Sequence, residues 1–204
     1  MSETRSVLLV HGAGSGPWVF EGWRGAFGDA DIVALDLHAG LRVAEASMLN
    51  YEAAVAATAG LLERPLAVVG WSMGGLAAMM AARRVEPEAL VLLEPSPPGE
   101  IQGYDERIEP AAGTFDPEEA YGRFPPGVAK RPESALARAE RKRGISVPRL
   151  PERTLVVYGR EFADERGRLL ASHYGVDADA LAADHWELVL DADARETAAR
   201  YLSA

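Results

Sequence analysis

A serine between glycines, in the segment Gly70-Trp71-Ser72-Met73-Gly74-Gly75, is the sharpest chemical signal in the sequence. It follows the apolar run Leu66–Val69 and precedes small residues typical of a helix. When a strand runs into a helix through such a turn, the serine at the turn has a strained backbone. Side chains at Gly70 and Gly74 would collide with the neighbouring backbone. We therefore predict that Ser72 is a nucleophile. The alternative, a glycine-rich turn of a nucleotide fold, lacks the G-x-G-x-x-G pattern.

A second glycine-rich loop, His11-Gly12-Ala13-Gly14-Ser15-Gly16, follows the apolar run Val7–Val10. Such a loop can turn backbone N–H groups toward a neighbouring strand end and stabilise the oxyanion of a tetrahedral intermediate. The natural pair of donors is the N–H of Ala13 with the N–H of Met73. A phosphate loop is the competing interpretation, but no Lys-Ser or Lys-Thr follows these glycines.

His11-Gly12, the turn at Ser72 and Asp184-His185-Trp186 together resemble the α/β-hydrolase family, and the resemblance spans nearly the whole chain. The family places its nucleophile, acid and histidine in that order, with the histidine after the last strand. The resemblance implies that His185 is the general base. It also implies a sheet that begins at the family's third strand.

Three other histidines compete for the role of base. His11 directly precedes the glycine loop and more naturally orders that loop, His38 follows the second strand in a turn, and His173 falls in a predicted surface helix. Asp36 also ends a strand, but it precedes Ser72, so we expect it to order a turn.

The acid is open among three carboxylates. The family's usual position, three residues after Gly159, holds Phe162, and the nearest substitutes are Glu161 and Asp164. Asp164 also has the pattern of a helix N-cap. Glu94 ends an apolar strand one strand after the serine, where some family members place their acid, and a charge there is costly unless it is paired. We favour Glu94 over Asp164 and Glu161.

These residues need a rigid framework, and the sequence predicts an α/β fold with a mostly parallel sheet of about six strands and helices on both faces. Five strands are apolar runs, and a weaker sixth falls within 176–182. The strands are Ser6–Val10, Asp31–Leu35, Leu66–Val69, Ala89–Leu93 and Thr154–Tyr158. The helices are Trp18–Phe27, Met48–Glu63, Met73–Arg84, Asp164–Tyr174 and Ala192–Ser203.

The alternation breaks at about 99–150, where prolines and an Arg-rich helical stretch, Glu133–Arg143, intervene. We interpret this as a short helical lid inserted into a single domain, 1–204. Its nine acidic and nine basic residues cancel, so the net charge of −10 belongs to the remaining scaffold. Aromatic residues of the insert would suit a modest apolar substrate: Tyr104, Phe115, Tyr121 and Phe124.

Composition narrows the class of partner. With 21 basic against 31 acidic residues the chain repels nucleic acid and anionic membranes on average, and its apolar runs are too short to span a bilayer. The absence of cysteine excludes disulfides and Cys-type metal sites and fits a cytoplasmic protein. We expect a small-molecule substrate, no metal and no cofactor, and we leave a homo-oligomer open.

The predicted activity is that of a carboxylesterase-like serine hydrolase acting on a small, largely uncharged ester through an acyl-enzyme. Gly12, Trp18 and Trp71 are candidate substrate-binding residues. A thioesterase, a lactonase or a C–C hydrolase of the same fold is an alternative, as is a ligand-binding protein without activity.

Overall fold

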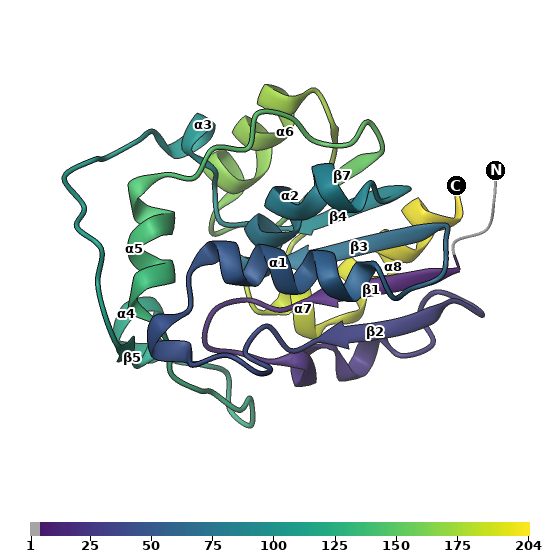
Figure 1. Cartoon of the computed structure of the whole chain (residues 1–204). Coiled ribbons are helices and arrows are strands. Elements are labelled where there is room, and N and C mark those ends of the chain that lie inside the picture. The colour runs from purple at the N-terminus through teal and green to yellow at the C-terminus, as the bar shows by residue number, and fades with distance from the viewer. Residues whose placement is uncertain (1–4) are drawn as a thin grey trace.

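The computed structural model describes residues 5–204, and its centre is a six-stranded sheet in the order β2-β1-β3-β4-β7-β8 (Figure 1). Every neighbouring pair in this sheet is parallel. The strands are β1 (Ser6–Val10), β2 (Asp31–Leu35), β3 (Leu66–Trp71), β4 (Ala89–Leu93), β7 (Thr154–Tyr158) and β8 (Asp177–Ala180). The predicted α/β class with six strands is confirmed.

The position of each strand explains its sequence. Strands β1, β3 and β4 are buried along their whole length, because helices cover both faces of the sheet, and apolar residues can fill every position. The weak sixth strand is β8, which lies at the edge beside β7. It has only four residues, DADA, and most are exposed, so it carries no apolar run.

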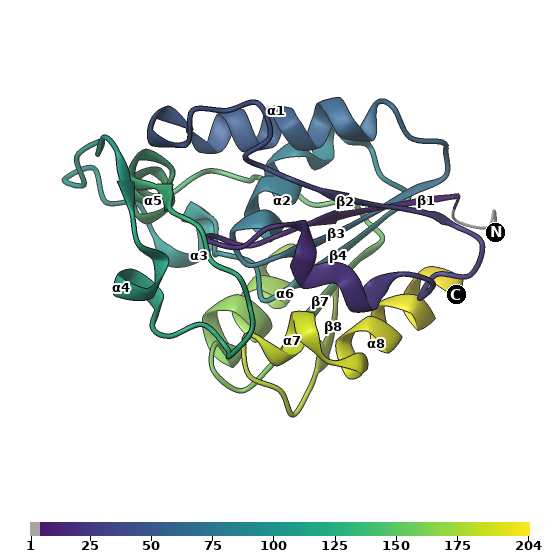
Figure 2. The same cartoon turned by 90° about the horizontal axis from the view of Figure 1, so that it is seen from below.

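Helices form a layer on each side of the sheet (Figure 2). Helices α1 (Met48–Ala59), α2 (Met73–Val85) and α6 (Leu169–Tyr174) pack into one core cluster. A 3-10 helix (Pro17–Trp23) packs into the other cluster with α7 (Glu187–Leu190) and α8 (Ala192–Ser203). These two layers hold the strands rigidly from both sides.

Several helix boundaries differ from the prediction. The expected helix Trp18–Phe27 is a 3-10 helix that ends at Trp23, and Gly25 and Gly28 beyond it have positive φ. The expected helix Met48–Glu63 ends at Ala59, because Gly60 caps it. The expected helix Asp164–Tyr174 begins as a π-helical segment, Ala163–Arg168, and continues as α6.

The segment between β4 and β7 lies beyond the carboxyl ends of the strands (Figure 1). It contains α3 (Gly99–Gln102), β5 (Thr114–Phe115), α4 (Pro117–Tyr121), β6 (Glu133–Ser134) and α5 (Ala135–Arg143). Strands β5 and β6 form a separate antiparallel pair. We call this segment, residues 99–150, the insert. Among the helices of residues 5–204, none has both the length and the apolar character needed to cross a bilayer.

Candidate active site

Ser72 stands on a strained turn between β3 and α2. Its backbone has φ 54° and ψ −121°, a conformation that L residues rarely adopt. Gly70 and Gly74 are required here, because a Cβ on Gly70 would lie 2.7 Å from the Cα of Gly75, and one on Gly74 would overlap the backbone of Val10. The turn is also tied to β4, since the Ser72 N–H donates to the carbonyl of Leu93 at 3.1 Å.

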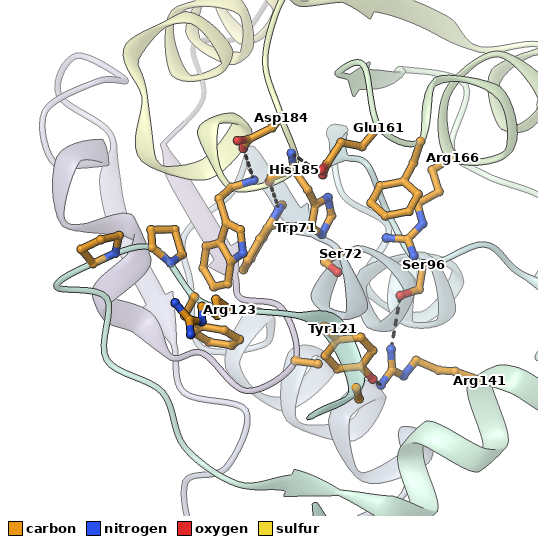
Figure 3. A pocket seen from close by; sticks show the side chains of 17 residues that line it. Trp71, Ser72, Ser96, Tyr121, Arg123, Arg141, Glu161, Arg166, Asp184 and His185 are labelled. Atoms are coloured by element: carbon orange, nitrogen blue, oxygen red, sulfur yellow. Dashed lines mark hydrogen bonds between the residues drawn. The ribbon is translucent and has the colours of Figure 1, made fainter. Parts of the chain in front are cut away.

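His185 and Glu94 meet beside this serine, although they lie 91 positions apart in the chain. Nδ1 of His185 is 2.7 Å from Oε2 of Glu94. The Glu94 side chain is fully buried, and its Oε1 accepts the N–H of Gly159 at 2.7 Å. Glu94 also has a positive φ, 38°. Figure 3 shows the His185 ring next to Ser72 in one cavity.

Aromatic rings and a further carboxylate hold His185 in place. Its ring centroid lies 5.1 Å from that of Trp71 and 5.3 Å from that of Phe162. The indole N–H of Trp71 donates to the carbonyl of His185 at 3.0 Å, and the backbone N–H of His185 donates to Glu161 at 3.1 Å. With Nδ1–H donating to Glu94, the ring presents an unprotonated Nε2 that can accept a proton.

The other two candidate acids occupy different positions. The exposed Asp164 accepts hydrogen bonds from Arg168 and lies in the first turn of the π-helical segment, whose N-cap is Phe162 and not Asp164. Glu161 contacts the backbone of His185 and not its ring. Glu94 reaches the ring because β4 pairs with β7, which brings the end of β4 alongside Gly159.

The two predicted oxyanion donors come from the glycine loop after β1 and from the start of α2. Ala13 lines the cavity with Ser72. Met73 is the first residue of α2, and the first N–H groups of a helix have no partner within that helix. The glycine at position 12 permits close approach, because a Cβ there would lie 2.7 Å from the ring of Trp71 and 3.0 Å from Cβ of Ser72.

His11 follows β1 directly, and its ring holds the glycine loop in place. Its Nδ1–H donates to the carbonyl of Gly12 at 2.8 Å, and its Nε2 accepts the N–H of Leu37 at 3.1 Å. The ring is fully buried, and this burial lowers the pKa of His11. A neutral imidazole with its proton on Nδ1 satisfies both contacts.

Arg131 of the insert contacts the same glycine loop. Backbone N–H of Arg131 donates to the carbonyl of Gly14 at 2.9 Å, and its Nε–H donates to the carbonyl of Ser15 at 2.8 Å. Its guanidinium also pairs with Asp36, at 2.6 Å. Asp36 in turn accepts the N–H of His38, so it orders the turn as predicted.

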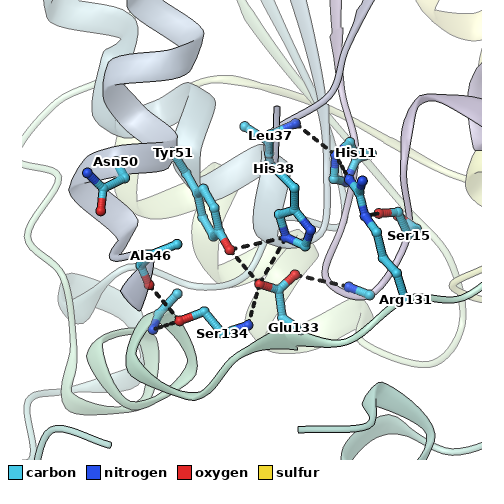
Figure 4. A network of polar contacts seen from close by, with 12 residues as sticks. His11, Ser15, Leu37, His38, Ala46, Asn50, Tyr51, Arg131, Glu133 and Ser134 are labelled. Carbon is cyan, nitrogen blue, oxygen red and sulfur yellow. Dashed lines mark hydrogen bonds and ion pairs between the residues drawn. The ribbon is translucent and has the colours of Figure 1, made fainter. Parts of the chain in front are cut away.

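Glu133 completes this attachment in a buried network (Figure 4). Its Oε2 accepts the N–H of Gly14 at 3.1 Å, while its Oε1 accepts the hydroxyl of Tyr51 at 2.6 Å and lies 3.3 Å from Nε2 of His38. Burial raises the pKa of Glu133, but the hydrogen bonds from His38 and Tyr51 outweigh it and lower the pKa to about 2. Sequence reasoning missed this network, because nothing local marks a glutamate of the neutral insert as buried.

The cavity over Ser72 has a volume of about 820 Å³ and lies between the carboxyl ends of the central strands and the insert. Its lining has apolar, basic, acidic and hydroxyl members: Ala13, Trp71, Ser72, Ser96, Ala120, Tyr121, Arg123, Phe124, Pro125, Pro126, Arg141, Glu161, Phe162, Arg166, Asp184, His185 and Trp186.

Of the predicted substrate-binding residues, Trp71 lines this cavity, but Gly12 and Trp18 do not. Gly12 lies behind Trp71, in contact with its ring. The Trp18 indole N–H donates to the carbonyl of Ala129 at 3.0 Å, and Arg131 stacks over its ring. Trp18 therefore supports the insert instead of facing a ligand.

Comparison with known proteins gives one family. A model described as "Alpha/beta hydrolase family" matches residues 7–202. A sequence comparison with curated proteins gives no match.

Solved structures of similar fold include proteins that act on different compounds. RedJ, solved with a PEG molecule in its active site, is 20% identical, with a TM-score of 0.67 over 97% of this chain and 90% of RedJ. A pyrethroid hydrolase from Sphingobium faniae is 16% identical, with a TM-score of 0.65 over 98% of each chain. The type II thioesterase BorB from the borrelidin biosynthetic cluster is 16% identical, with a TM-score of 0.65 over 100% of this chain and 93% of BorB.

Proposed function

The chain belongs to the alpha/beta hydrolase family, and we propose that it is a serine hydrolase that cleaves an ester bond through an acyl-enzyme on Ser72. The single observation that carries this proposal is the 2.7 Å contact between His185 and the buried Glu94, next to a serine held at a positive φ. A carboxylate that accepts Nδ1–H leaves the opposite ring nitrogen free to act as a base.

In the first half of the reaction His185 removes the proton from Ser72 as the hydroxyl oxygen attacks the ester carbonyl. The backbone N–H groups of Ala13 and Met73 stabilise the negative oxygen of the tetrahedral intermediate. His185 then gives its proton to the leaving alcohol, and the acyl group stays on Ser72. In the second half, water attacks the acyl-enzyme with His185 again as base, and the acid product leaves.

The substrate is a small molecule that fits within about 820 Å³ and places an apolar part against Trp186, Phe124 and the two following prolines. A thioester would use the same residues, and BorB is a thioesterase of similar fold. Because an ester and a thioester pass through the same acyl-enzyme, we assign the mechanism to Ser72 and take the ester as the first substrate to test.

Removal of either Ser72 or His185 tests this proposal. We expect Ser72→Ala and His185→Ala each to lower kcat on p-nitrophenyl butyrate by about 10⁴-fold or more, as for other enzymes in which these residues act as a unit. Circular dichroism and thermal unfolding check that both variants are folded. Undiminished turnover in either folded variant would contradict the mechanism.

A fluorophosphonate probe separates an enzyme from a ligand-binding protein of the same fold. The probe labels only a serine whose hydroxyl is activated by a base. We expect mass spectrometry to find the label on Ser72 of the wild-type protein and none in His185→Ala. A wild-type protein that resists the probe at all concentrations would favour the ligand-binding alternative.

A further inference from the structure

Two arginine side chains of the cavity, Arg141 and Arg166, have no carboxylate within ion-pair distance among residues 5–204. Both line the space above Ser72, one from α5 of the insert and the other from the π-helical segment after β7. None of the arginine ion pairs found within residues 5–204 includes either of them, with 4.0 Å as the limit.

The contacts of these two guanidinium groups leave part of each unsatisfied. Arg141 donates to the hydroxyls of Tyr121, at 2.9 Å, and Ser96, at 3.5 Å, and its buried Nε–H has no partner. The Nε–H of Arg166 is buried without a partner as well. The Arg166 guanidinium instead lies over the ring of Phe162, 3.9 Å from its centroid.

Burial makes this arrangement costly for Arg166. Burial lowers the pKa of its guanidinium, nearby Glu94 and Glu165 offset that effect in part, and the positive charge of Arg141 adds to it. An unpaired cation that is partly buried is unfavourable, and two such cations that repel each other are more so. An anion bound between them would relieve both effects.

The acidic side chains of the same cavity are already engaged elsewhere. Glu161 accepts the backbone N–H of His185, at 3.1 Å. Asp184 accepts the N–H groups of Trp186 and Glu187, both at 2.8 Å, where it caps α7. The third arginine of the lining, Arg123, is exposed and lies on the far side of the cavity from Arg166 (Figure 3).

The cavity therefore has two unlike walls on either side of Ser72. Figure 3 shows Arg166, Ser96, Arg141 and Tyr121 together along one side. Trp186 and Phe124 pack ring to ring, with centroids 4.5 Å apart, and together with Pro125 and Pro126 they form an apolar part of the lining beside the exposed Arg123. A ligand that satisfies both walls has a negatively charged group at one end and an apolar body.

We propose that the substrate is an ester that also carries a negatively charged group, a carboxylate or a phosphate. Arg141 and Arg166 bind this group. This inference rests on the proposed hydrolase function and names the substrate class of that site. Guanidinium groups suit these anions because their donors form a planar fork that binds two oxygens at once. The proposal replaces the expectation of a largely uncharged substrate, which came from the aromatic residues of the insert.

Calorimetric titration of the folded Ser72→Ala protein tests the anion site without turnover. The probes are hexanoate, pentylphosphonate and the neutral isostere hexanamide, which share one pentyl chain. We expect one of the two anions to bind at least about tenfold more tightly than hexanamide, since a hydrogen bond to a charged group contributes that much or more. The preferred anion identifies a carboxylate or a phosphate-like group. Equal affinities for all three probes, or no binding at all, would overturn the proposal.

Matched variants show whether the two arginines make the contact. Arg141→Met and Arg166→Met, each in the Ser72→Ala background, should lower the affinity for the preferred anion by about tenfold or more. Arg143→Met and Arg168→Met remove the same charge from exposed positions of the same two segments and should change it less than about threefold. If these controls weaken anion binding as much as the cavity variants do, the affinity depends on the overall positive charge and not on contact with the two arginines, and the proposal is wrong. Arg166→Lys, which keeps the charge without the fork, should bind with intermediate affinity even if Arg166→Met does not fold.

Kinetics of the wild-type enzyme separate failure of this inference from failure of the hydrolase proposal. The mono-p-nitrophenyl ester of adipic acid carries a free carboxylate, and methyl p-nitrophenyl adipate is its neutral counterpart. We expect kcat/KM to be about tenfold or more higher for the anionic ester, and Arg141→Met to lower that ratio. If both esters are cleaved with equal kcat/KM, the protein is a hydrolase without the anion site. If neither ester is cleaved and the fluorophosphonate probe does not react, the hydrolase proposal fails, whatever the titration shows.

Discussion

Within residues 5–204, two buried glutamates each lie against a histidine, and only one of these pairs stands beside Ser72, the proposed nucleophile. Glu94 contacts Nδ1 of His185, whose ring borders the cavity of Ser72. Glu133 approaches Nε2 of His38 at 3.3 Å, and the hydroxyl of Tyr51 lies 3.2 Å from the same nitrogen. Both glutamates are fully buried.

The difference lies in what surrounds each carboxylate. Glu94 accepts hydrogen bonds from two donors, the N–H of Gly159 and the ring of His185. The His185 ring also lines the cavity. Glu133 has four neighbouring donors from four parts of the chain: Gly14, His38, Tyr51 and Ser134. The first arrangement places one imidazole beside Ser72, whereas the second joins the insert to the scaffold. A buried carboxylate and imidazole are therefore no sign of catalysis by themselves.

Replacement of Glu94 should have the largest effect on activity. In Glu94→Gln the side chain has one oxygen for two donors. If the amide oxygen accepts the N–H of Gly159, the amide NH₂ group faces His185. The ring would then carry its proton on Nε2 and could not accept the proton of Ser72. We expect kcat on p-nitrophenyl butyrate to fall by about 10³- to 10⁴-fold, with little change in thermal unfolding.

The rival acids supply the control. Asp164→Asn removes an exposed carboxylate that pairs with Arg168, and it should change kcat less than about twofold. A loss of activity in Asp164→Asn comparable to that in Glu94→Gln would move the acid to Asp164 and contradict our assignment.

Replacement of Glu133 should act mainly on stability and less on rate. Glu133→Gln leaves donors of the network facing one another, and we expect the free energy of unfolding to fall by about 3 kcal/mol, as when one partner of a buried pair is removed. Because Gly14 loses an acceptor beside the oxyanion loop, kcat should fall by about tenfold. Urea unfolding and steady-state kinetics measure the two effects.

The pH dependence of this stability has a definite sign. The pKa of Glu133, about 2, lies below that of an unfolded chain, near 4.3, so its contribution is complete above that value. As the pH falls from about 4.3 toward 2 the unfolded chain binds the proton while the folded state does not, so the contribution is progressively lost. The difference in unfolding free energy between wild type and Glu133→Gln should therefore shrink below about pH 4. A difference that stays constant from pH 7 to pH 2.5 would show that the charge of Glu133 does not stabilise the fold.

Replacement of Tyr51 should give the smallest change and sharpen the contrast between the pairs. Tyr51→Phe removes one hydroxyl that donates to Glu133, while His38 and two backbone N–H groups remain. We expect a loss of about 1–2 kcal/mol in the free energy of unfolding and less than a twofold change in kcat. A large fall in kcat without loss of stability would mean that this network takes part in the reaction.

The features that the sequence alone determined are those that a local pattern encodes. Five strands follow from runs of apolar residues, because a strand covered on both faces needs no polar alternation. The turn at Ser72 follows from Gly70 and Gly74, which are close to it in sequence and leave it room. The edge strand β8 and the ends of the helices were harder to predict, because short exposed elements carry weak patterns and single glycines decide where they stop.

Only the tertiary structure decided which distant charges meet. The sequence favours Glu94 because it ends an apolar strand, but only the pairing of β4 with β7 brings this carboxylate, and not Glu161 or Asp164, to the ring of His185. The insert is neutral when its residues are counted, yet folding buries Glu133 among donors and turns Arg141 toward the cavity. A charge count sums over residues, whereas electrostatic energy depends on distance and burial, and these exist only once the chain has folded.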